Sequence, residues 1–143
     1  MSFNQEEVVY LQGQRLARIA TVAPDGQPDV MPVGYQFDGK HIYVGGMNPA
    51  NTRKFRNVRS GNSRVAVVID DLVAVSPWTV RGMRIYGNAE IVDRQEGQFG
   101  PGHYMRITPT ASCSWNLDGR PTRHDRPVIY RRAVHEAAVT QSA

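Results

Sequence analysis

The sequence predicts a mainly β protein built as one barrel with a few small helices. Short apolar runs of strand length recur along its 143 residues, and Gly, Pro, Asp and Asn separate them at fairly regular spacing. Several short strands joined by such turns are typical of barrels. The length suits a single domain, because one hydrophobic core usually occupies about 100 to 200 residues. A second domain is therefore not expected.

The N-terminal third predicts one short helix followed by paired strands. Asn4 can cap the helix, Glu7 lies three residues later as in a capping box, and Gly13 ends it. The strands expected next, joined by turns at residues 24–26 and 38–39, span residues 16–22, 29–37 and 41–44. In the second of these strands, alternation places four apolar residues on one face: Met31, Val33, Tyr35 and Phe37.

The remainder predicts a second helix and the last strands. A loop at residues 47–51 leads into a helix that Asn51 or Thr52 can cap and that Gly61 stops. The later strands are expected at residues 64–69, 80–92, 104–107 and 112–115. Gly82 and Gly87 inside the long strand indicate a bulge or the close approach of a ligand. From Asp118 onward the sequence predicts a mobile basic tail.

Composition limits the location and the partners. The net charge is +4, and arginine carries nearly all the positive charge because Lys40 and Lys54 are the only lysines. Arginine suits phosphates and carboxylates, so phosphate ligands and nucleic acid are both plausible anionic partners. The absence of a long apolar run and the acidic start predict a soluble, cytoplasmic protein without membrane contact. The single cysteine, Cys113, is expected to be a small, partly buried hydrophobic residue.

The stretch best suited to hold a ligand is residues 45–57. A strand end, a loop of small residues and a helix start come together there with Arg53, Lys54 and Arg56. Free amides at a helix start and neighbouring cations favour a bound phosphate. A solvated basic helix face is the alternative.

The preceding strand predicts a flat wall beside this corner. Its residues Val30, Met31, Pro32 and Val33 would lie near the strand end at Val44 and Gly45. Pro32 cannot donate to a strand ladder, which leaves backbone groups free for a planar ligand. An ordinary edge strand is the alternative explanation.

Competing motifs do not fit their usual chemistry. Residues 34–40 copy most of a P-loop, but His41 stands where the magnesium-binding hydroxyl belongs and the context is a hairpin. The four histidines lack metal-ligand spacing, so no metal site is expected. No nucleophile elbow and no paired catalytic carboxylates are present.

Across residues 5–117 the chain resembles the pyridoxamine 5′-phosphate oxidase-like split barrels, especially their branch of F420-dependent oxidoreductases. The stretches that together carry the resemblance are RLARIATVAPDGQPDVMPVGYQF, NTRKFRNV, RVAVVIDD, VRGMRIYGNAEIV, FGPG, RITP and SWNLDG. The resemblance implies a homodimer of six-stranded split β-barrels with a few short helices. Residues 1–117 would form the barrel that binds FMN or the deazaflavin F420, and residues 118–143 a basic C-terminal tail.

The resemblance also implies roles for particular residues. Arg53 and Lys54 would hold the cofactor phosphate with help from Thr52. The residues that would line its ring system are Val30, Met31, Pro32 and Val33, with Val44 and Gly45 beside them. Gly82 replaces a glutamine of the oxidase, and Trp115 from a second subunit would cover the site.

The activity implied is hydride transfer between reduced F420, or alternatively FMN, and a small organic acceptor of unknown identity. No catalytic residue is nominated, because such a cofactor carries the chemistry. One alternative is a carrier or sensor that binds the cofactor without turnover. Another is an FMN-dependent pyridoxamine or pyridoxine 5′-phosphate oxidase, for which the run Arg123, His124, Asp125 and Arg126 would contact ligand. Nucleic acid is disfavoured as a partner, because the aromatic residues fall mostly at core-like strand positions.

Overall fold

The computed structural model describes residues 2–46, 49–123 and 125–136. In this part of the chain one antiparallel sheet is accompanied by two α-helices and a single 3₁₀ turn. The elements in chain order are α1 (Gln5–Gly13), β1 (Leu16–Val22), β2 (Pro28–Phe37), β3 (Ile42–Val44), η1 (Pro49–Asn51), α2 (Arg53–Arg59), β4 (Arg64–Ala74), β5 (Thr79–Arg94), β6 (Gly102–Trp115) and β7 (Tyr130–Val134).

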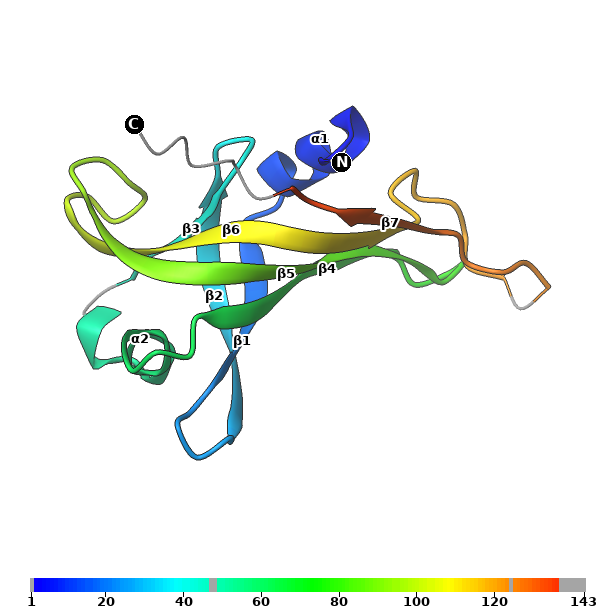
Figure 1. Cartoon of the computed structure of the whole chain (residues 1–143). Helices are drawn as coiled ribbons and strands as arrows, with labels where there is room; N and C mark the ends of the chain where they lie inside the picture. The colour runs from blue at the N-terminus through cyan, green and yellow to red at the C-terminus, as the bar shows by residue number, and fades with distance from the viewer. Residues whose placement is uncertain (1, 47–48, 124, 137–143) are drawn as a thin grey trace.

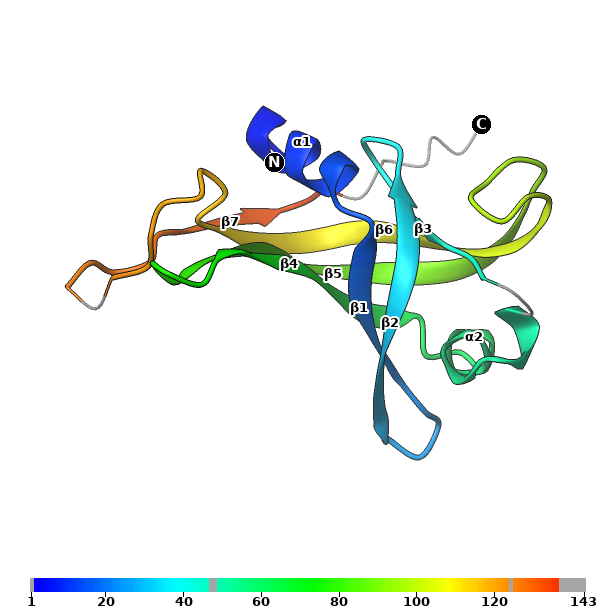
Figure 2. The same cartoon turned by 180° about the vertical axis from the view of Figure 1, so that it is seen from behind.

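The sheet closes on itself through its third strand. The strand order is β3-β2-β1-β4-β5-β6-β7, and β3 pairs a second time with β6, for example Tyr43 opposite Arg106. This pairing completes a six-stranded barrel, which confirms the predicted architecture. The second half of β6 runs beyond the seam and pairs with β7, with Ser112 opposite Ala133 (Figures 1 and 2).

Alternation along the strands fills the barrel with apolar side chains. Inward positions of β1 to β6 are buried while their neighbours face out, as the period of two requires. The inward residues with at most 1% exposed area include Ala17, Ile19, Ile42, Val44, Val67, Ile69, Met83, Ile85, Met105 and Ile107. The two helices lie at opposite ends of the barrel (Figures 1 and 2).

α1 begins at the predicted capping box and is fixed by a buried carboxylate. The Glu7 amide donates to Asn4 Oδ1 at 2.8 Å, and the Asn4 amide donates to Glu7 Oε1 at 3.0 Å. Glu7 is completely buried, and its carboxylate also accepts the Ser114 hydroxyl at 2.6 Å and pairs with the Arg131 guanidinium. Because a buried carboxylate must be paired, α1 is locked to β6 and β7.

α2 plugs the other end of the barrel. Phe55 and Val58 are buried, and Asn57 donates its amide to Thr21 of β1 at 2.9 Å. Thr52 precedes the helix as predicted, but its hydroxyl donates to the Pro49 carbonyl at 2.7 Å instead of capping a helix amide. The predicted loop before α2 lies partly outside the described residues, since residues 47 and 48 are not covered.

Two expectations about the second half need correction. The segments expected as separate strands at residues 104–107 and 112–115 form one strand, β6, which runs through Pro109. The prediction of a mobile tail from Asp118 onward is also wrong in part, because β7 lies within it. The sequence of β7, YRRAV, buries only Ala133, so it lacks the alternation that marks a strand. Pairing with β6 and the ion pair of Arg131 with Glu7 hold it in place.

The remaining strands lie where the sequence predicts them, except that β4 extends to Ala74, beyond its predicted end at residue 69. The register between β5 and β6 changes at Tyr86 and Gly87, which confirms an irregularity at the second glycine of the long strand. Cys113 is buried, as expected of a small hydrophobic residue. No helix of the described residues is long and apolar enough to cross a membrane.

Candidate functional site

β2 has a free edge beside the segment that leads to α2. β1 pairs with β2 along residues 28–34, whereas β3 pairs with it only at residues 35–37. After Val44 the chain leaves the sheet toward η1 and α2. Within the described residues no strand occupies the second edge of β2 over residues 28–34. Backbone groups on a free edge can bind a ligand, and this is the edge that Pro32 indicated.

The residues predicted to form the wall differ in which of their groups a ligand can contact. Val30 is 63% exposed and Met31 is 50% exposed, and Pro32 is also exposed. Val33 and Val44 instead point into the core. The first three can therefore meet a ligand with their side chains, whereas Val33 and Val44 can offer only backbone groups.

Gly45 lies where no larger residue fits. A Cβ added there would be 2.5 Å from Cε1 of Tyr104 and 3.1 Å from Cδ2 of Phe99. Phe99 belongs to the connection between β5 and β6, and its amide donates to the Tyr104 hydroxyl at 3.0 Å. This connection therefore packs against the strand end that the sequence predicted to be part of the site.

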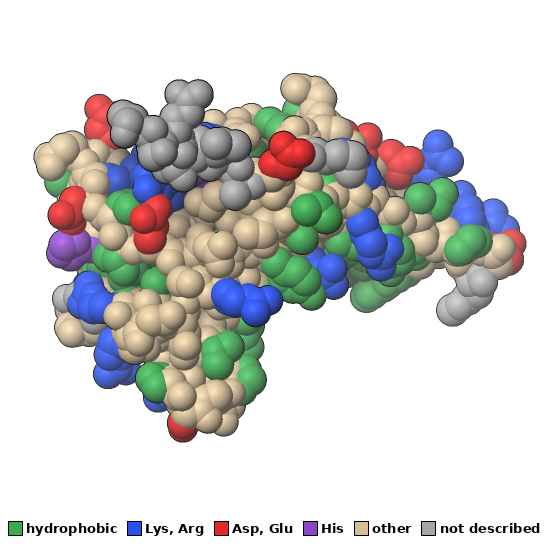
Figure 3. Space-filling model, in the orientation of Figure 1, with side chains coloured by type: hydrophobic (Ala, Val, Ile, Leu, Met, Phe, Trp, Pro, Cys, Tyr) green, Lys and Arg blue, Asp and Glu red, His purple; other side chains and the backbone are tan. Residues whose placement is uncertain are grey.

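The start of α2 faces the beginning of β2. Burial lowers the pKa of the Lys54 ammonium, and the nearby Asp29 carboxylate opposes this shift. Asp29 belongs to β2, one residue before Val30, so the structure brings Lys54 near the predicted wall. Arg53 and Arg56 are exposed, and Lys and Arg side chains gather over α2 (Figure 3).

Apart from the β2 edge and the start of α2, Gly82 and Trp115 form a cluster on the outer face of β5 and β6. The two residues are directly opposite in the ladder, and a Cβ at Gly82 would lie 2.7 Å from Cζ2 of the Trp115 indole. It would also lie 2.8 Å from Cβ of Asp70 and 2.9 Å from the Ile69 carbonyl oxygen. The indole therefore fills the space that any side chain at position 82 would need. The close neighbour of Gly82 is thus a residue of the same chain, and the approach of a ligand to this glycine stays a prediction.

Arginines on the outer face lie between the free edge of β2 and the cluster of Gly82 and Trp115. Arg18 of β1 is opposite Pro32 of β2 and pairs with Asp70, which is in turn opposite Gly82. Arg84 continues the same face on β5. The sequence analysis did not single out these arginines. A positively charged residue at an outward position of an otherwise apolar, alternating strand is the pattern that could have indicated them.

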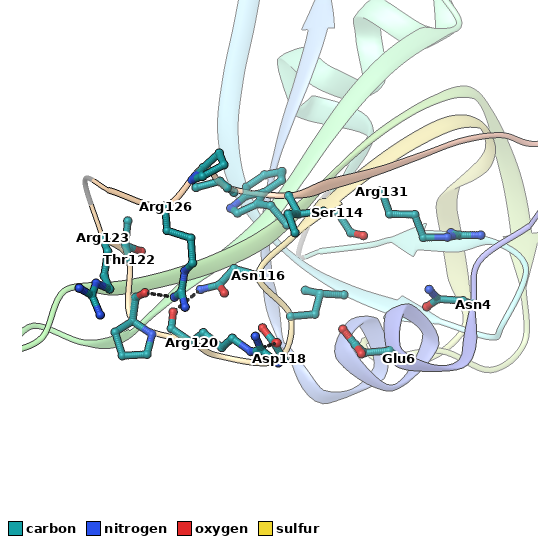
Figure 4. Close-up of a pocket in the computed structure, with 16 residues that line it drawn as sticks. Asn4, Glu6, Ser114, Asn116, Asp118, Arg120, Thr122, Arg123, Arg126 and Arg131 are labelled. Carbon is teal, nitrogen blue, oxygen red and sulfur yellow. Dashed lines mark hydrogen bonds and ion pairs between the residues drawn. The ribbon is translucent and has the colours of Figure 1, made fainter.

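The tail residues that the sequence singled out lie near Trp115. A cavity of about 360 Å³ is bounded by Trp115 and by the connection between β6 and β7, including Arg123 and Arg126 (Figure 4). Arg123 pairs with Asp125 at 3.0 Å, and Arg126 donates to the Pro121 carbonyl at 2.6 Å. His124 lies outside the described residues. Contact of this run with a ligand stays a prediction.

No group of three His, Cys, Asp or Glu side chains among the described residues could hold a metal ion. The site therefore offers cations, a free strand edge and exposed apolar side chains as its means of binding.

A closed six-stranded barrel with a free edge on β2 and a basic helix beside it defines the class of split-barrel proteins. The chain belongs to the pyridoxamine 5′-phosphate oxidase family, whose model matches residues 3–136. This confirms the resemblance and places the chain among oxidoreductases.

Similar proteins agree with this assignment. The chain is 35% identical over 124 residues to the 5a,11a-dehydrotetracycline/5a,11a-dehydrooxytetracycline reductase of Streptomyces rimosus, an alignment that covers 83% of this chain and 87% of the relative. A solved F420 reductase shares the fold with a TM-score of 0.58 and 24% identity, over 73% of this chain and 93% of that one. A conserved protein of Mycobacterium tuberculosis does so with a TM-score of 0.64 and 24% identity, over 82% and 86% of the two chains.

Proposed function

We propose that this protein is a reductase that binds F420, or alternatively FMN, and catalyses hydride transfer to a small organic acceptor. The observation that carries the proposal is the free edge of β2, where exposed Val30, Met31 and Pro32 lie next to the basic start of α2. The similar reductase of Streptomyces rimosus supports a reductase activity, and the shared fold of an F420 reductase favours F420 as the first choice.

The residues present fit a phosphorylated cofactor with a planar ring. Arg53 and Lys54 supply cations for a phosphate, and the partial burial of Lys54 strengthens its attraction to an anion because solvent screens it less. The exposed apolar side chains of β2 suit a flat ring, and the free backbone edge suits polar ring atoms. Gly82 offers no side-chain donor.

When bound, a flavin or deazaflavin supplies the hydride chemistry. The chain itself anchors the phosphate at Arg53 and Lys54 and orients the ring along β2. Trp115 lies directly opposite Gly82 in the ladder and next to Tyr130, whose ring centroid is 6.1 Å from that of the indole. We propose that such aromatic cover excludes water from a cofactor held by a second copy of the chain.

A second copy is proposed because exposed large apolar residues gather on the outer face of the sheet. Cross-strand partners share a face, and exposed large apolar residues recur at the outward positions of β1, β2, β4, β5 and β7. These residues are Leu16, Val22, Val30, Leu72, Tyr86, Tyr130 and Val134. Green side chains are visible in the angle between the β1–β2 hairpin and the arm that carries β7 (Figure 3). Exposed apolar side chains gathered on one face favour an interaction site.

Titration of the purified protein with F420 and with FMN tests the proposal. Lys54→Ala is expected to weaken binding about ten- to a hundredfold, because a charged hydrogen bond to phosphate contributes roughly 1.5 to 3 kcal/mol. Arg59→Ala is the matched control, since Arg59 is an exposed cation in the last turn of the same helix.

Binding that is unchanged in Lys54→Ala, or no binding of either cofactor, would overturn the proposed site. Tight binding without hydride transfer to any acceptor would instead favour a carrier or sensor.

A further inference from the structure

A groove lies between the end of α1, the last residues of β2 and the connection between β5 and β6. It has a volume of about 420 Å³, which is within the usual range of small-molecule sites. Its polar lining consists of Gln12, Gln14, Arg15, Gln36 and Gln98. None of the residues that line it is among the exposed apolar residues assigned above to a second copy.

Hydrogen bonds hold both walls of the groove to β2. The buried Tyr35 hydroxyl donates to the Leu11 carbonyl at 2.5 Å, which fixes the end of α1. On the other side, the Gln98 amide donates to Gln36 Oε1 at 2.9 Å, which fixes the connection between β5 and β6. The two contacts start from neighbouring residues of one strand, so this strand sets the width of the groove.

The carboxamide of Gln98 lies at the border between the groove and the predicted wall. A Cβ added at Gly34 would be 3.1 Å from Nε2 and 3.3 Å from Oε1 of Gln98. Alternate residues of a strand share a face, so Gly34 lies between Pro32 of the wall and Gln36 of the groove. Pro32 and Gln36 are roughly 13 Å apart along the strand. The groove is therefore the next space along β2 after the wall.

The lining offers neutral hydrogen-bonding groups and one positive charge. Each of the four carboxamides can both donate and accept hydrogen bonds. Of their side-chain atoms, only Gln36 Oε1 is in a hydrogen bond within the described residues, and Arg15 makes no ion pair there. None of the described residues that line the groove carries a carboxylate. The groove therefore suits a polar ligand that is anionic and not cationic.

We propose that this groove binds a small organic molecule that carries hydroxyl, carbonyl or amide groups and one anionic group. The carboxamides pair with the neutral groups, and the Arg15 guanidinium pairs with the anionic group. One further step rests on the proposed function: the molecule is then the acceptor of the hydride, because the groove follows directly on the wall that would hold the cofactor ring.

The experiment follows the side-chain amide signals of the ¹⁵N-labelled full chain by NMR, without cofactor, during titration with three probes of similar size. Salicylate carries a hydroxyl and a carboxylate, salicylamide replaces the carboxylate by a neutral amide, and toluene has neither group. The Gln98 and Gln36 signals are expected to shift with a saturating dependence for the first two probes, with salicylate bound more tightly. Toluene should leave them in place. This part needs no variant, so it does not depend on whether a mutant folds.

Variants separate the two kinds of contact. Gln98→Ala is expected to weaken binding of both polar probes about two- to tenfold, as the loss of a hydrogen bond does. Gln95→Ala is the matched control, because Gln95 is an exposed glutamine of the same connection that does not line the groove. Arg15→Gln should weaken salicylate about two- to fivefold and leave salicylamide nearly unchanged, since an exposed ion pair contributes little. Arg59→Gln, which removes an equal charge from α2, is its control.

Three results would overturn the proposal: no saturable shift of the Gln98 signal, an equal response to toluene, or salicylamide bound as tightly as salicylate. The outcome is separate from that of the cofactor titration, because Lys54→Ala should bind the probes like the wild type. A chain that binds F420 or FMN but none of the probes would refute the groove alone. A chain that binds the probes but neither cofactor would keep the groove as a ligand site and refute its role for an acceptor.

Discussion

Gly82 and Trp115 show how a single missing side chain determines the shape of the outer face. The indole lies where a Cβ at position 82 would be, within 2.7 Å of it. Two of the other close neighbours, Asp70 Cβ and the Ile69 carbonyl, belong to the backbone region of β4 and cannot move independently of the sheet. The glutamine that the resemblance expects in the oxidase therefore cannot be accommodated here without rearrangement.

Gly82→Gln is expected to lower the free energy of unfolding by about 1 to 3 kcal/mol, as overpacking usually does. Urea unfolding monitored by tryptophan fluorescence measures it. Trp115→Ala should relieve only the contact with the indole, so the double variant should stay less stable than Trp115→Ala alone. Gly13→Ala is the control, since a Cβ there meets nothing within 4 Å. A fully stable Gly82→Gln would show that the indole is not fixed in place.

At the scale of elements, β7 is held to the barrel by two polar contacts besides its ladder. Arg131 pairs with buried Glu7 of α1, and just past the strand His135 lies 2.8 Å from the Ser112 hydroxyl of β6. The ring of Phe3 covers the imidazole, with centroids 4.4 Å apart. The N-terminal segment, β6 and β7 therefore form one unit outside the barrel seam.

This unit should weaken in mild acid. Burial lowers the pKa of His135 below its ordinary value near 6.5, with nearby Glu7 opposing and Arg131 adding to the shift. Between the lowered pKa and about 6.5 the unfolded chain binds more protons than the folded one, so stability falls as the pH drops through this window. In His135→Gln the melting temperature should fall less as the pH drops. The hydrogen-exchange protection of the β7 amides, corrected for the pH dependence of intrinsic exchange rates, should also fall less.

His41 provides the comparison for this effect. Burial also lowers the pKa of His41, but that residue lies just before β3, away from β7. His41→Gln should therefore change the global slope and leave the pH dependence of β7 protection as it is. Equal effects of the two variants on β7 would contradict a local role for His135.

The elements differ in how well the sequence predicts them. The capping box of Asn4 and Glu7 and the turn residues act locally, so α1 and both early hairpins were predictable. β7 was not, because its register comes from β6 and its side chains carry no alternation. Likewise Arg53 and Lys54 were visible as a basic cluster, whereas the ion pair of Arg131 with Glu7 joins residues 124 positions apart in the chain.

At the scale of the whole molecule, the apolar outer face predicts a dimer. Leu72→Asp is expected to weaken self-association at least tenfold, because it would bury a charge in the interface. Sedimentation velocity over a range of concentrations measures this. Val9→Asp is the control, because Val9 is also exposed, at 58% against 44% for Leu72, but lies on α1. A wild-type chain that stays monomeric at every concentration would exclude the second copy.

The connection between β6 and β7 begins and ends on strands that pair with each other. It contributes residues to the cavity beside Trp115 but none to the ladder within the barrel. Because closure entropy changes slowly with loop length, insertions there cost the barrel little. The shape of the cavity beside the Trp115 indole can therefore change in evolution while the barrel that supports it remains the same.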